Sequence, residues 1–198
     1  ISKNWINKQH RDIYVRKSKI EGYRSRAIYK LEEIDQKFKI LKEVHTAIDL
    51  GAAPGSWSQY LSEKIINGKI LAIDLLEFKK VNKVHQIIGD FSDEASKQKI
   101  KEYFNKKVDL VVSDMAVNTT GNKNVDSIVT GELCLDAIIF AKKQLNPKGK
   151  FISKLFMGSS FNEVVSEAKK IFKEVRVFKP PSSRKDSKEN FIICKILH

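Results

Sequence analysis

Asp-Leu-Gly-Ala-Ala-Pro-Gly at residues 49–55 is the stretch that decides the fold. It overlaps the end of a short apolar run at 46–50 and opens a helical pattern at 56–66. A strand that passes through small residues directly into a helix is typical of an open α/β sheet, whose ligands bind beyond the carboxyl ends of the strands. Small residues also let the backbone approach a ligand closely. The stretch therefore predicts a strand–loop–helix unit at a binding edge.

The same alternation of strand and helix continues on both sides of this unit, and it predicts a doubly wound, mostly parallel α/β sheet. The eleven residues 179–189 near the end have no helical pattern. Because a parallel crossover normally contains a helix, we expect the last two strands to be antiparallel neighbours in a seven-stranded sheet. The predicted strands are 46–50, 69–74, 85–88, 108–113, 150–155, 175–178 and 190–197, and the predicted helices are 24–38, 56–66, 92–104, 127–145 and 161–172.

Polar residues stand at the ends of successive predicted strands, and those strand ends should share one edge of the sheet. The 49–55 stretch is not G-x-G-x-x-G, and Pro54 interrupts the row of amides that would hold a pyrophosphate. Asp74 can accept both hydroxyls of a ribose, and Asp90 can accept an exocyclic amine beside Phe91. The set predicts a site for a nucleoside without a pyrophosphate, such as S-adenosylmethionine. Two alternatives stay open: a dinucleotide-dependent dehydrogenase, and acids that serve only as helix caps or turn residues.

Charge is unevenly distributed along the 198-residue chain, whose formal net charge is +13. Residues 1–30 hold nine Lys and Arg against two acids, residues 169–198 hold nine against three, and the middle is neutral. An excess of this size favours a polyanionic partner, nucleic acid first. The alternative is a pair of solvated basic tails. We expect a single domain over 1–198, with a basic N-terminal RNA-binding extension and helix at 1–45 and a catalytic core at 46–198.

Several classes of protein are not favoured by the sequence. Cys134 and Cys194 are far apart and predict neither a zinc site nor a disulfide framework, and the four histidines have no metal-ligand spacing. No apolar run approaches the roughly eighteen residues of a membrane span. The N-terminal residues lack a signal-peptide core. We therefore expect a cytoplasmic protein without metal or membrane association, and a monomer, since no apolar stripe demands a dimer.

Longer motifs resemble the FtsJ (RrmJ) family of ribose 2′-O-methyltransferases. They are YRSRAIYKLEEI at 23–34, DLGAAPGSWSQYL at 49–61, SDMAVN at 113–118, FISKLF at 151–156 and KPPSSRKDSKENF at 179–191. The resemblance covers essentially the whole chain in family order and is strongest to the bacterial branch. It implies a Rossmann-like, S-adenosylmethionine-dependent fold. It also implies methylation of a uridine ribose in large-subunit (23S) ribosomal RNA, on the assembled subunit, with S-adenosylhomocysteine as the second product.

The resemblance also implies residue roles. The catalytic tetrad of the family falls on Lys30, Asp114, Lys154 and Glu189. With Gly51 from the strand-end pattern, the expected cofactor contacts are Gly51, Gly55, Trp57, Asp74, Asp90 and Asp114. Two departures are visible: Ser56 stands where the family usually has Gly, and Val117 where it usually has Pro. Ser56 is small enough for cofactor binding to survive, whereas Val117 removes a rigid turn beside Asp114.

Lys154 is the residue on which the expected chemistry depends. An alcohol is a poor nucleophile at neutral pH, so a nearby base or charge stabiliser assists its attack. We expect Lys154 to accept the proton or orient the hydroxyl, with Asp114 orienting Lys154. Burial and Lys30 would lower the pKa of Lys154, and the two acids would raise it. The alternative is a lysine that reaches solvent from a strand end.

RNA contacts are expected from the two basic ends, since Lys and Arg bind phosphates. Trp5, Tyr14, Tyr23 and Tyr29 are interleaved with the first group and are candidates for base stacking. Two other functions stay open: an idle RNA-binding assembly factor of the same fold, and a methyltransferase for transfer RNA or a messenger cap. The candidate RNA-binding residues are Lys3, Lys8, Arg11, Arg16, Lys17, Lys19, Arg24, Arg26, Lys179, Arg184, Lys185 and Lys188.

Overall fold

The 49–55 stretch joins strand β1 (Thr46–Leu50) to helix α4 (Ser56–Lys64), as the sequence predicts. The structure is a computed structural model that describes residues 12–116 and 123–198. Every residue of β1 is buried. Gly55 caps α4 with a φ of 102°, a conformation that favours glycine. The loop therefore turns sharply at the edge of the sheet and passes straight into the helix.

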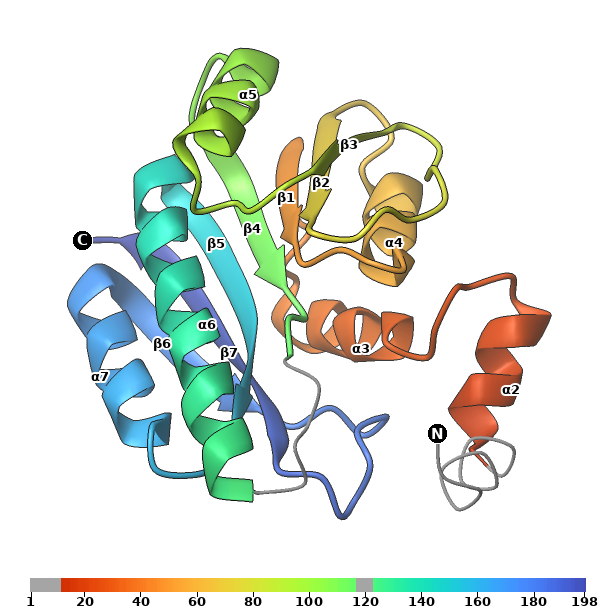
Figure 1. The fold of residues 1–198 in the computed structure, drawn as a ribbon, viewed down its shortest axis with the longest axis vertical. Coiled ribbons are helices and arrows are strands. Elements are labelled where there is room, and N and C mark those ends of the chain that lie inside the picture. Colours follow the sequence, from red (N-terminus) through yellow and green to blue (C-terminus); the bar gives the residue numbers. More distant parts are fainter. Residues whose placement is uncertain (1–11, 117–122) are drawn as a thin grey trace.

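Seven strands form one sheet in the order β3-β2-β1-β4-β5-β7-β6 (Figure 1). The pairs from β3 to β5 are parallel, whereas β7 is antiparallel to both β5 and β6. The expected fold class, with one reversed strand, is confirmed. The remaining strands are β2 (Lys69–Asp74), β3 (Val84–Ile88), β4 (Val108–Ser113), β5 (Leu145–Phe156), β6 (Phe172–Phe178) and β7 (Glu189–Leu197).

Helices cover both faces of the sheet, and each face has its own apolar core. On one face, side chains of α5, α6 and α7 pack against the strands. On the other face, α3 and α4 do so. Helix α2 lies beside α3 at the margin of the molecule (Figure 1). The bounds are α2 (Ile13–Ile20), α3 (Ile28–Phe38), α5 (Glu94–Phe104), α6 (Lys123–Gln144) and α7 (Phe161–Ile171).

Some predicted boundaries were wrong. The helix predicted at 24–38 begins only at Ile28, because Ser25 Oγ accepts from the backbone N–H of Ala27 in a turn that precedes it. The strand predicted at 150–155 begins at Leu145, which pairs with Val108, so the turn-like residues that follow Leu145 lie inside β5. Helix α2 was not predicted at all. Pairing with β4 extends β5 beyond the residues whose sequence pattern predicts a strand.

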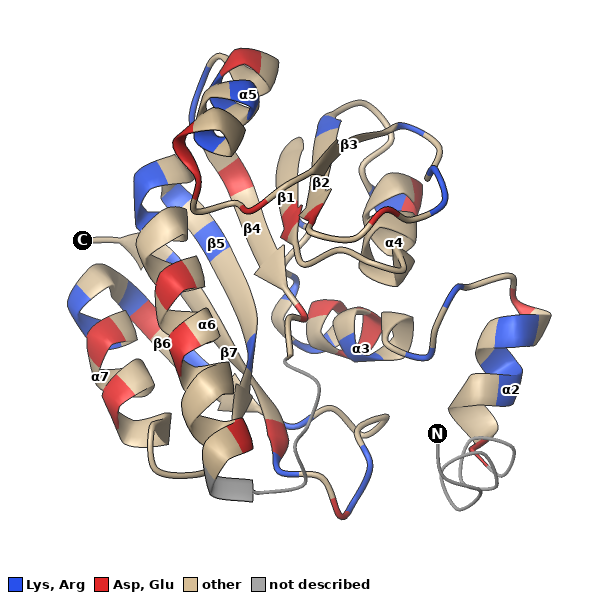
Figure 2. Ribbon diagram, in the orientation of Figure 1, with Lys and Arg blue, Asp and Glu red and all other residues tan. Residues whose placement is uncertain are grey.

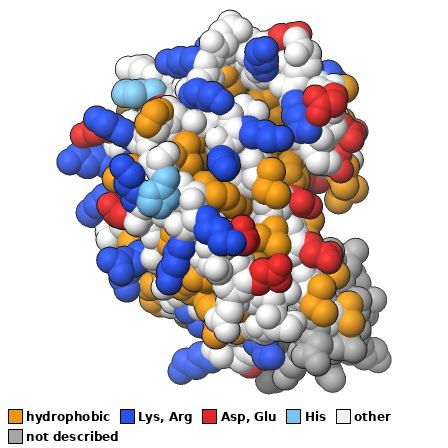
Figure 3. All heavy atoms as spheres, turned by 90° about the vertical axis from the view of Figure 1, so that its left-hand side faces the viewer, with side chains coloured by type: hydrophobic (Ala, Val, Ile, Leu, Met, Phe, Trp, Pro, Cys, Tyr) orange, Lys and Arg blue, Asp and Glu red, His pale blue; other side chains and the backbone are white. Residues whose placement is uncertain are grey.

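Both basic ends belong to the folded domain where the structure describes them. Residues from 12 onward form α2 and α3, and the C-terminal end forms β6 and β7. Figure 2 shows Lys and Arg on α2 and on the loop between β6 and β7. For these residues the solvated-tail alternative is wrong. The face shown in Figure 3 also carries many basic side chains, so positive charge is not confined to one side.

Two further observations concern the described residues. Cys134 and Cys194 are both buried free thiols, and burial raises the pKa of Cys134 to about 12. Within 12–116 and 123–198, none of the helices combines the length and apolar character that crossing a membrane requires.

Candidate active site

The register of the sheet gathers side chains from three strands at one edge. Ser113 at the end of β4 pairs with Ser153 of β5, so Asp114 and Lys154 follow side by side. Strand β7 runs the other way, and its first residue, Glu189, pairs with Phe156 at the end of β5. Reversal of β7 therefore brings the beginning of that strand to the carboxyl ends of β4 and β5.

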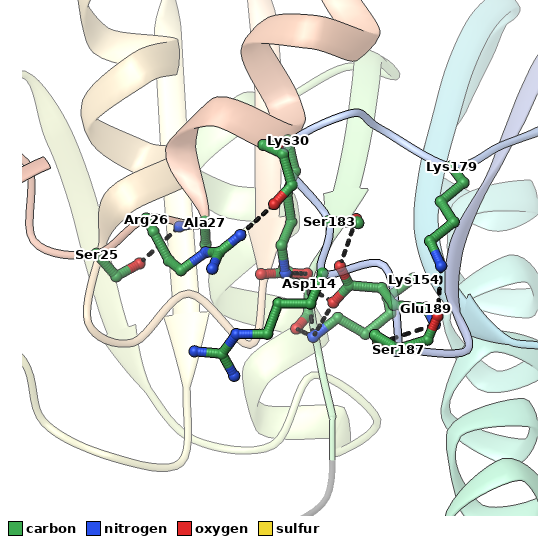
Figure 4. A network of polar contacts seen from close by, with 12 residues as sticks. Ser25, Arg26, Ala27, Lys30, Asp114, Lys154, Lys179, Ser183, Ser187 and Glu189 are labelled. Carbon is green, nitrogen blue, oxygen red and sulfur yellow. Dashed lines mark hydrogen bonds and ion pairs between the residues drawn. The ribbon is translucent and has the colours of Figure 1, made fainter. Parts of the chain in front are cut away.

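Helix α3 supplies the fourth side chain, Lys30. Ile28, Leu31 and Ile34 bury one face of α3 in the core. Trp57 Nε1 donates a hydrogen bond of 2.8 Å to the carbonyl of Ala27, which ties the start of α3 to α4. Figure 4 shows Lys30 reaching from the helix toward the strand ends. The structure thus brings together the four residues that the resemblance assigns to the tetrad.

The four charged groups of the tetrad alternate in sign and contact one another closely. Lys154 Nζ lies 3.1 Å from Asp114 Oδ1 and 3.8 Å from Glu189 Oε2. It also donates to the Asp114 backbone carbonyl at 2.9 Å. Lys30 Nζ lies 2.7 Å from Glu189 Oε2 and 4.0 Å from Asp114 Oδ1. Glu189 therefore pairs mainly with Lys30, and Asp114 pairs mainly with Lys154.

Burial makes this arrangement sensitive to charge. The side chains of Lys30, Lys154 and Glu189 are 12%, 9% and 9% exposed. Burial by itself would lower the Lys30 pKa, but Asp114 and Glu189 outweigh it and hold that pKa above its ordinary value. Burial would raise the Glu189 pKa, but the two ammonium groups outweigh it and hold that pKa below its ordinary value. Lys30 and Glu189 are thus a charged pair at neutral pH.

The loop before β7 contains a support for the tetrad that the sequence analysis missed. Ser183 Oγ donates to Glu189 Oε1 at 2.7 Å. The neighbouring Ser182 donates to the Glu33 carboxylate through its backbone N–H, at 2.9 and 3.1 Å, and through its hydroxyl, at 2.7 Å. Glu33 thus fixes the loop to α3, and Ser183 orients Glu189. Glu33 lies one helical turn after Lys30, so its place on the same side of the helix could have indicated that it supports the tetrad.

A cavity of about 470 Å³ adjoins the tetrad beyond the ends of β1, β2, β3 and β4. Asp114 belongs to both the cavity and the tetrad. A Cβ at Gly51 would lie 2.1 Å from Met115 Cγ, so only glycine fits against that side chain. Four of the predicted cofactor residues line this cavity: Gly51, Asp74, Asp90 and Asp114.

Local turns hold the two acids at the far side of the cavity. Asp74 Oδ2 accepts from Ala53 N and Oδ1 accepts from Leu76 N, each at 2.8 Å. Asp90 Oδ1 accepts from Ser92 N at 2.8 Å. The turn role that was weighed for these acids is therefore present, and both also face the cavity.

Two predicted cofactor residues and one strand-end acid lie behind this cavity and are not among its lining residues. Trp57 is 3% exposed and packs against Phe191, with ring centroids 5.7 Å apart. Gly55 forms the turn into α4. Asp49 is buried and accepts from Ser58 Oγ at 2.6 Å, and burial raises the pKa of Asp49 to about 7.

The departures from the family pattern fall in different parts of the chain. Ser56 is the first residue of α4, and its hydroxyl lies 2.6 Å from that of Ser25. A helical backbone requires no glycine at this position. Val117 lies outside the described residues.

The candidate RNA-binding residues differ in their surroundings. Arg24 donates to the backbone carbonyls of Pro54, Lys79 and Lys80, and so fixes the 49–55 loop. Arg26 and Arg184 both contact the Asp12 carboxylate. Lys179 Nζ donates within its own loop, to the carbonyls of Lys185 and Ser187. Exposed residues are Arg16, Lys17, Lys19, Lys185 and Lys188, while Lys3, Lys8 and Arg11 lie outside the described residues.

The aromatic residues of the N-terminal part pack together. Tyr29 is 2% exposed, and its ring lies 5.4 Å from that of Tyr14 and 6.3 Å from that of Tyr23. Its hydroxyl donates to Glu21 at 2.6 Å. The stacking expected of Tyr29 is therefore wrong, because this ring serves the packing of α2 against α3. Trp5 lies outside the described residues.

Known proteins resemble this chain over most of its length. Ribosomal RNA large subunit methyltransferase E of Pelagibacter ubique is 61% identical over 197 residues, covering 100% of this chain and 97% of the relative. The enzyme of that name from Rickettsia akari is 46% identical, covering 98% of this chain and 88% of the relative.

Solved structures agree with the fold. One described as a ribosomal RNA methyltransferase of Plasmodium falciparum has a TM-score of 0.79 and 34% identity, covering 88% of this chain and 98% of that one. Human Methyltransferase-like protein 13 in complex with SAH has a TM-score of 0.58 and 15% identity, covering 85% and 79%. That second likeness concerns the fold alone. The FtsJ-like methyltransferase family matches residues 23–197, and this chain belongs to it.

Proposed function

We propose that this methyltransferase transfers the methyl group of S-adenosylmethionine to the 2′-hydroxyl of a uridine ribose in large-subunit ribosomal RNA. The observation that carries the proposal is the position of Asp114, which lines the cavity and also lies 3.1 Å from Lys154 Nζ. A donor in the cavity and an acceptor hydroxyl at Lys154 would therefore meet at one residue. The names of the curated relatives support the ribosomal substrate. Uridine and the 2′-oxygen rest on the family resemblance.

The cavity fits a nucleoside that carries an amino-acid chain. Its lining provides carboxylates at Asp74 and Asp90, a ring at Phe91 and exposed apolar side chains at Leu75 and Leu76. Carboxylates suit the hydroxyl and amine donors of a nucleoside. Gly51 and Ala53 of the 49–55 loop also line the space. When bound, S-adenosylmethionine supplies a methyl group on a positively charged sulfur, which becomes a neutral thioether on transfer.

The tetrad handles the proton of the acceptor. The new bond joins the methyl carbon to the ribose 2′-oxygen, and the proton of that hydroxyl must leave. Both lysines contact both acids, but Lys154 Nζ lies nearer to Asp114, at 3.1 Å, which is the acid that lines the cavity. Lys30 Nζ lies nearer to Glu189, at 2.7 Å, and neutralises it. In our proposal Lys154 first releases its own proton to solvent. Its neutral amine then orients the hydroxyl and accepts the hydroxyl proton, and Asp114 orients Lys154. General base assistance of this kind contributes about 10²–10⁴-fold to a rate.

Positioning supplies the rest of the catalysis. Because the methyl group is already activated by charge, the protein mainly has to align the donor and the acceptor, which is worth up to roughly 7–11 kcal/mol in well-oriented reactions. Three tetrad residues lie on β5, β7 and α3, and Asp114 directly follows β4. All four elements contribute to the core. The acceptor therefore meets a rigid site rather than a mobile loop.

A methylation assay tests this function. Purified protein is incubated with labelled S-adenosylmethionine and, in parallel, with intact large ribosomal subunits, naked 23S RNA, transfer RNA and capped messenger RNA. We expect label in large-subunit RNA, and we expect nuclease digestion with mass spectrometry to place it on the 2′-oxygen of a uridine. Label only in transfer RNA or in a cap would overturn the proposed substrate. RNA binding without transfer would support the idle assembly factor instead.

A further inference from the structure

A second and smaller cavity lies beside the tetrad, with a volume of about 190 Å³. Lys30 and Glu189 contribute tetrad groups to its lining, and Arg26 and Arg184 contribute two guanidinium groups. In RNA, a ribose carries its 2′-hydroxyl and its 3′-phosphate on adjacent carbons. A nucleotide that presents its 2′-oxygen to the tetrad must therefore hold a phosphate close by. The two arginines are the cationic groups of this cavity that the tetrad does not use.

The Asp12 carboxylate already occupies these two arginines. Arg26 Nη1 forms an ion pair with Asp12 Oδ2, and Arg184 Nε lies 3.3 Å from the same oxygen. The Asp12 side chain is only 9% exposed. The two guanidinium groups thus share one negatively charged oxygen, and a phosphate oxygen could accept from both of them in the same way. Asp12 thus shows that the arginine pair binds an oxyanion.

Other contacts also hold Arg26 in place, and the nearby Glu189 and Glu33 attract its charge. Its Nη2 group donates to the carbonyl of Ser182, in the loop that carries Ser183, and its guanidinium lies 5.3 Å from the centre of the Tyr14 ring. Burial and the nearby Arg184 lower the pKa of Arg26, because the two cations repel each other. An anion between them relieves that repulsion. Asp12 also caps α2 by accepting from Tyr14 N and Val15 N.

We infer that Arg26 and Arg184 form a binding site for the backbone phosphate of RNA next to the reacting ribose, and that Asp12 occupies this site in the free protein as an internal competitor. The inference rests on the proposed function, since it assigns a ligand to the edge of the same active site. RNA displaces the carboxylate and α2 then shifts away from the arginine pair. Asp12 accordingly weakens RNA binding and keeps the arginines ordered until RNA arrives.

Substitution of Asp12 tests the inference by measuring RNA affinity directly. Asn is as good a helix N-cap as Asp, so Asp12→Asn removes the charge and keeps the cap of α2. The probe is a short fluorescein-labelled single-stranded RNA, followed by anisotropy over a range of salt concentrations. If Asp12 fills the site about nine-tenths of the time, its removal tightens binding about tenfold. Arg184→Gln should weaken binding and reduce the slope of log affinity against log salt by about 0.7.

Glu21→Gln is the matched control, because it removes one negative charge from the end of α2 without touching the arginine pair. Glu21 accepts from the Tyr29 hydroxyl and lies 3.8 Å from Lys17, and Gln can still accept the first bond. The double variant of Asp12→Asn with Arg184→Gln should lose most of the gain, since coupled groups are not additive. Unfolding curves establish that each variant is folded.

Two results would overturn the site. One is an Asp12→Asn affinity equal to or weaker than that of Glu21→Gln, and the other is a gain that persists in the double variant. Either result would make Asp12 a structural partner that holds the arginines. Because this assay measures RNA binding and not methyl transfer, its result can be interpreted separately from that of the methylation assay. If the parent protein methylates RNA normally but Asp12→Asn does not change RNA affinity, the phosphate site is wrong and the proposed function stands. If the variants show the expected RNA affinities but the parent protein transfers no methyl group, the proposed function is wrong and the phosphate site stands.

Discussion

The cavity and the tetrad meet at Asp114, but the two regions are built in different ways. In the cavity, Asp74 and Asp90 each accept a hydrogen bond from a backbone N–H two residues later, and Asp74 also accepts from Ala53 N in the 49–55 loop. Backbone groups of turns and loops therefore fix them. In the tetrad, Lys30 and Glu189 are 159 residues apart and Lys154 lies 40 residues from Asp114. The parallel pairing of β4 with β5, the reversed strand β7 and the docking of α3 bring the tetrad together (Figure 4).

Because the two regions are held in different ways, they should respond differently to amino-acid substitution. Asp74 is held by uncharged backbone groups of its own turn and of the 49–55 loop, so the effect of a substitution there should stay within the cavity wall. In the tetrad, each buried charged group is held by opposite charges on other elements. Removing one charge leaves another buried charge without its partner, which destabilises the folded protein. The cavity should therefore tolerate separate changes, whereas the tetrad should respond as a unit.

The largest effect is expected at Asp114, which belongs to both regions. Asp114→Asn leaves Lys30 and Lys154 with Glu189 as the remaining tetrad acid, and it removes a carboxylate from the cavity wall. We expect methyl transfer to fall about 10²–10⁴-fold and cofactor affinity to fall as well, measured by single-turnover transfer and by calorimetry. If only methyl transfer or only cofactor affinity falls, Asp114 acts in only one of the two regions.

Glu189→Gln should show how strongly the tetrad depends on its charges. Removing one partner of a buried ion pair costs about 3–5 kcal/mol, because Lys30 and Lys154 lose a counter-charge. Since the two ammonium groups hold the Glu189 pKa below its ordinary value of 4.5, its stabilising effect is complete above pH 4.5 and is lost as the pH falls through the lowered pKa. Urea unfolding at neutral and acid pH measures both effects. Equal stability of the variant and the parent at neutral pH would contradict the charged tetrad.

Asp74→Asn should produce a smaller effect that stays within the cavity. Asn keeps one acceptor oxygen but no charge, so one of the two backbone N–H groups that donate to Asp74, those of Ala53 and Leu76, also loses its acceptor. A hydrogen bond to a charged group is worth about 1.5–3 kcal/mol, so cofactor affinity should fall about ten- to a hundredfold. Transfer at saturating cofactor should be unchanged. Glu77→Gln, at an exposed position three residues further on, is the matched control. A slower transfer at saturation would show that Asp74 also acts in the tetrad.

Ser183→Ala is expected to have the smallest effect, since it removes one hydrogen bond to Glu189. A single bond of this kind contributes about 1 kcal/mol, which corresponds to about a fivefold loss in kcat. The KM for RNA should not change, and Ser183→Thr should restore the rate because it restores the hydroxyl. If Thr fails to rescue, Ser183 acts through packing and not as a positioning residue.

The sequence predicted the parts of this molecule that depend on local signals. The turn chemistry of 49–55 and the strand-end acids Asp74 and Asp90 are examples, and so is the reversal of the last strand, which followed from the absence of a helical pattern at 179–189. Helix α2 escaped prediction because it buries only Ser18 and has no apolar face to give a period. The early start of β5 depends on pairing with Val108 and has no local signal.

Asp114 and Lys154 stand at the ends of predicted strands, but Lys30 and Glu189 could be located only through the family resemblance. Nothing near Lys30 or Glu189 in the sequence marks them as neighbours, because their contact depends on the whole fold. For the same reason the supports were missed: Ser182 and Glu33 are 149 residues apart, and Arg184 and Asp12 are 172 residues apart. Which residues from the two ends of a chain come into contact depends on the topology of the fold, and the amino-acid composition does not predict these pairs.

Lys154→Ala, with Lys148→Ala as the control on the exposed part of β5, tests the central claim most directly. The measurement is single-turnover methyl transfer to large-subunit RNA, with S-adenosylmethionine affinity determined on the same samples. We predict that Lys154→Ala reduces transfer about 10²–10⁴-fold while cofactor affinity remains that of the parent protein, and that Lys148→Ala changes neither quantity. Transfer by Lys154→Ala at the rate of the parent protein would contradict the account.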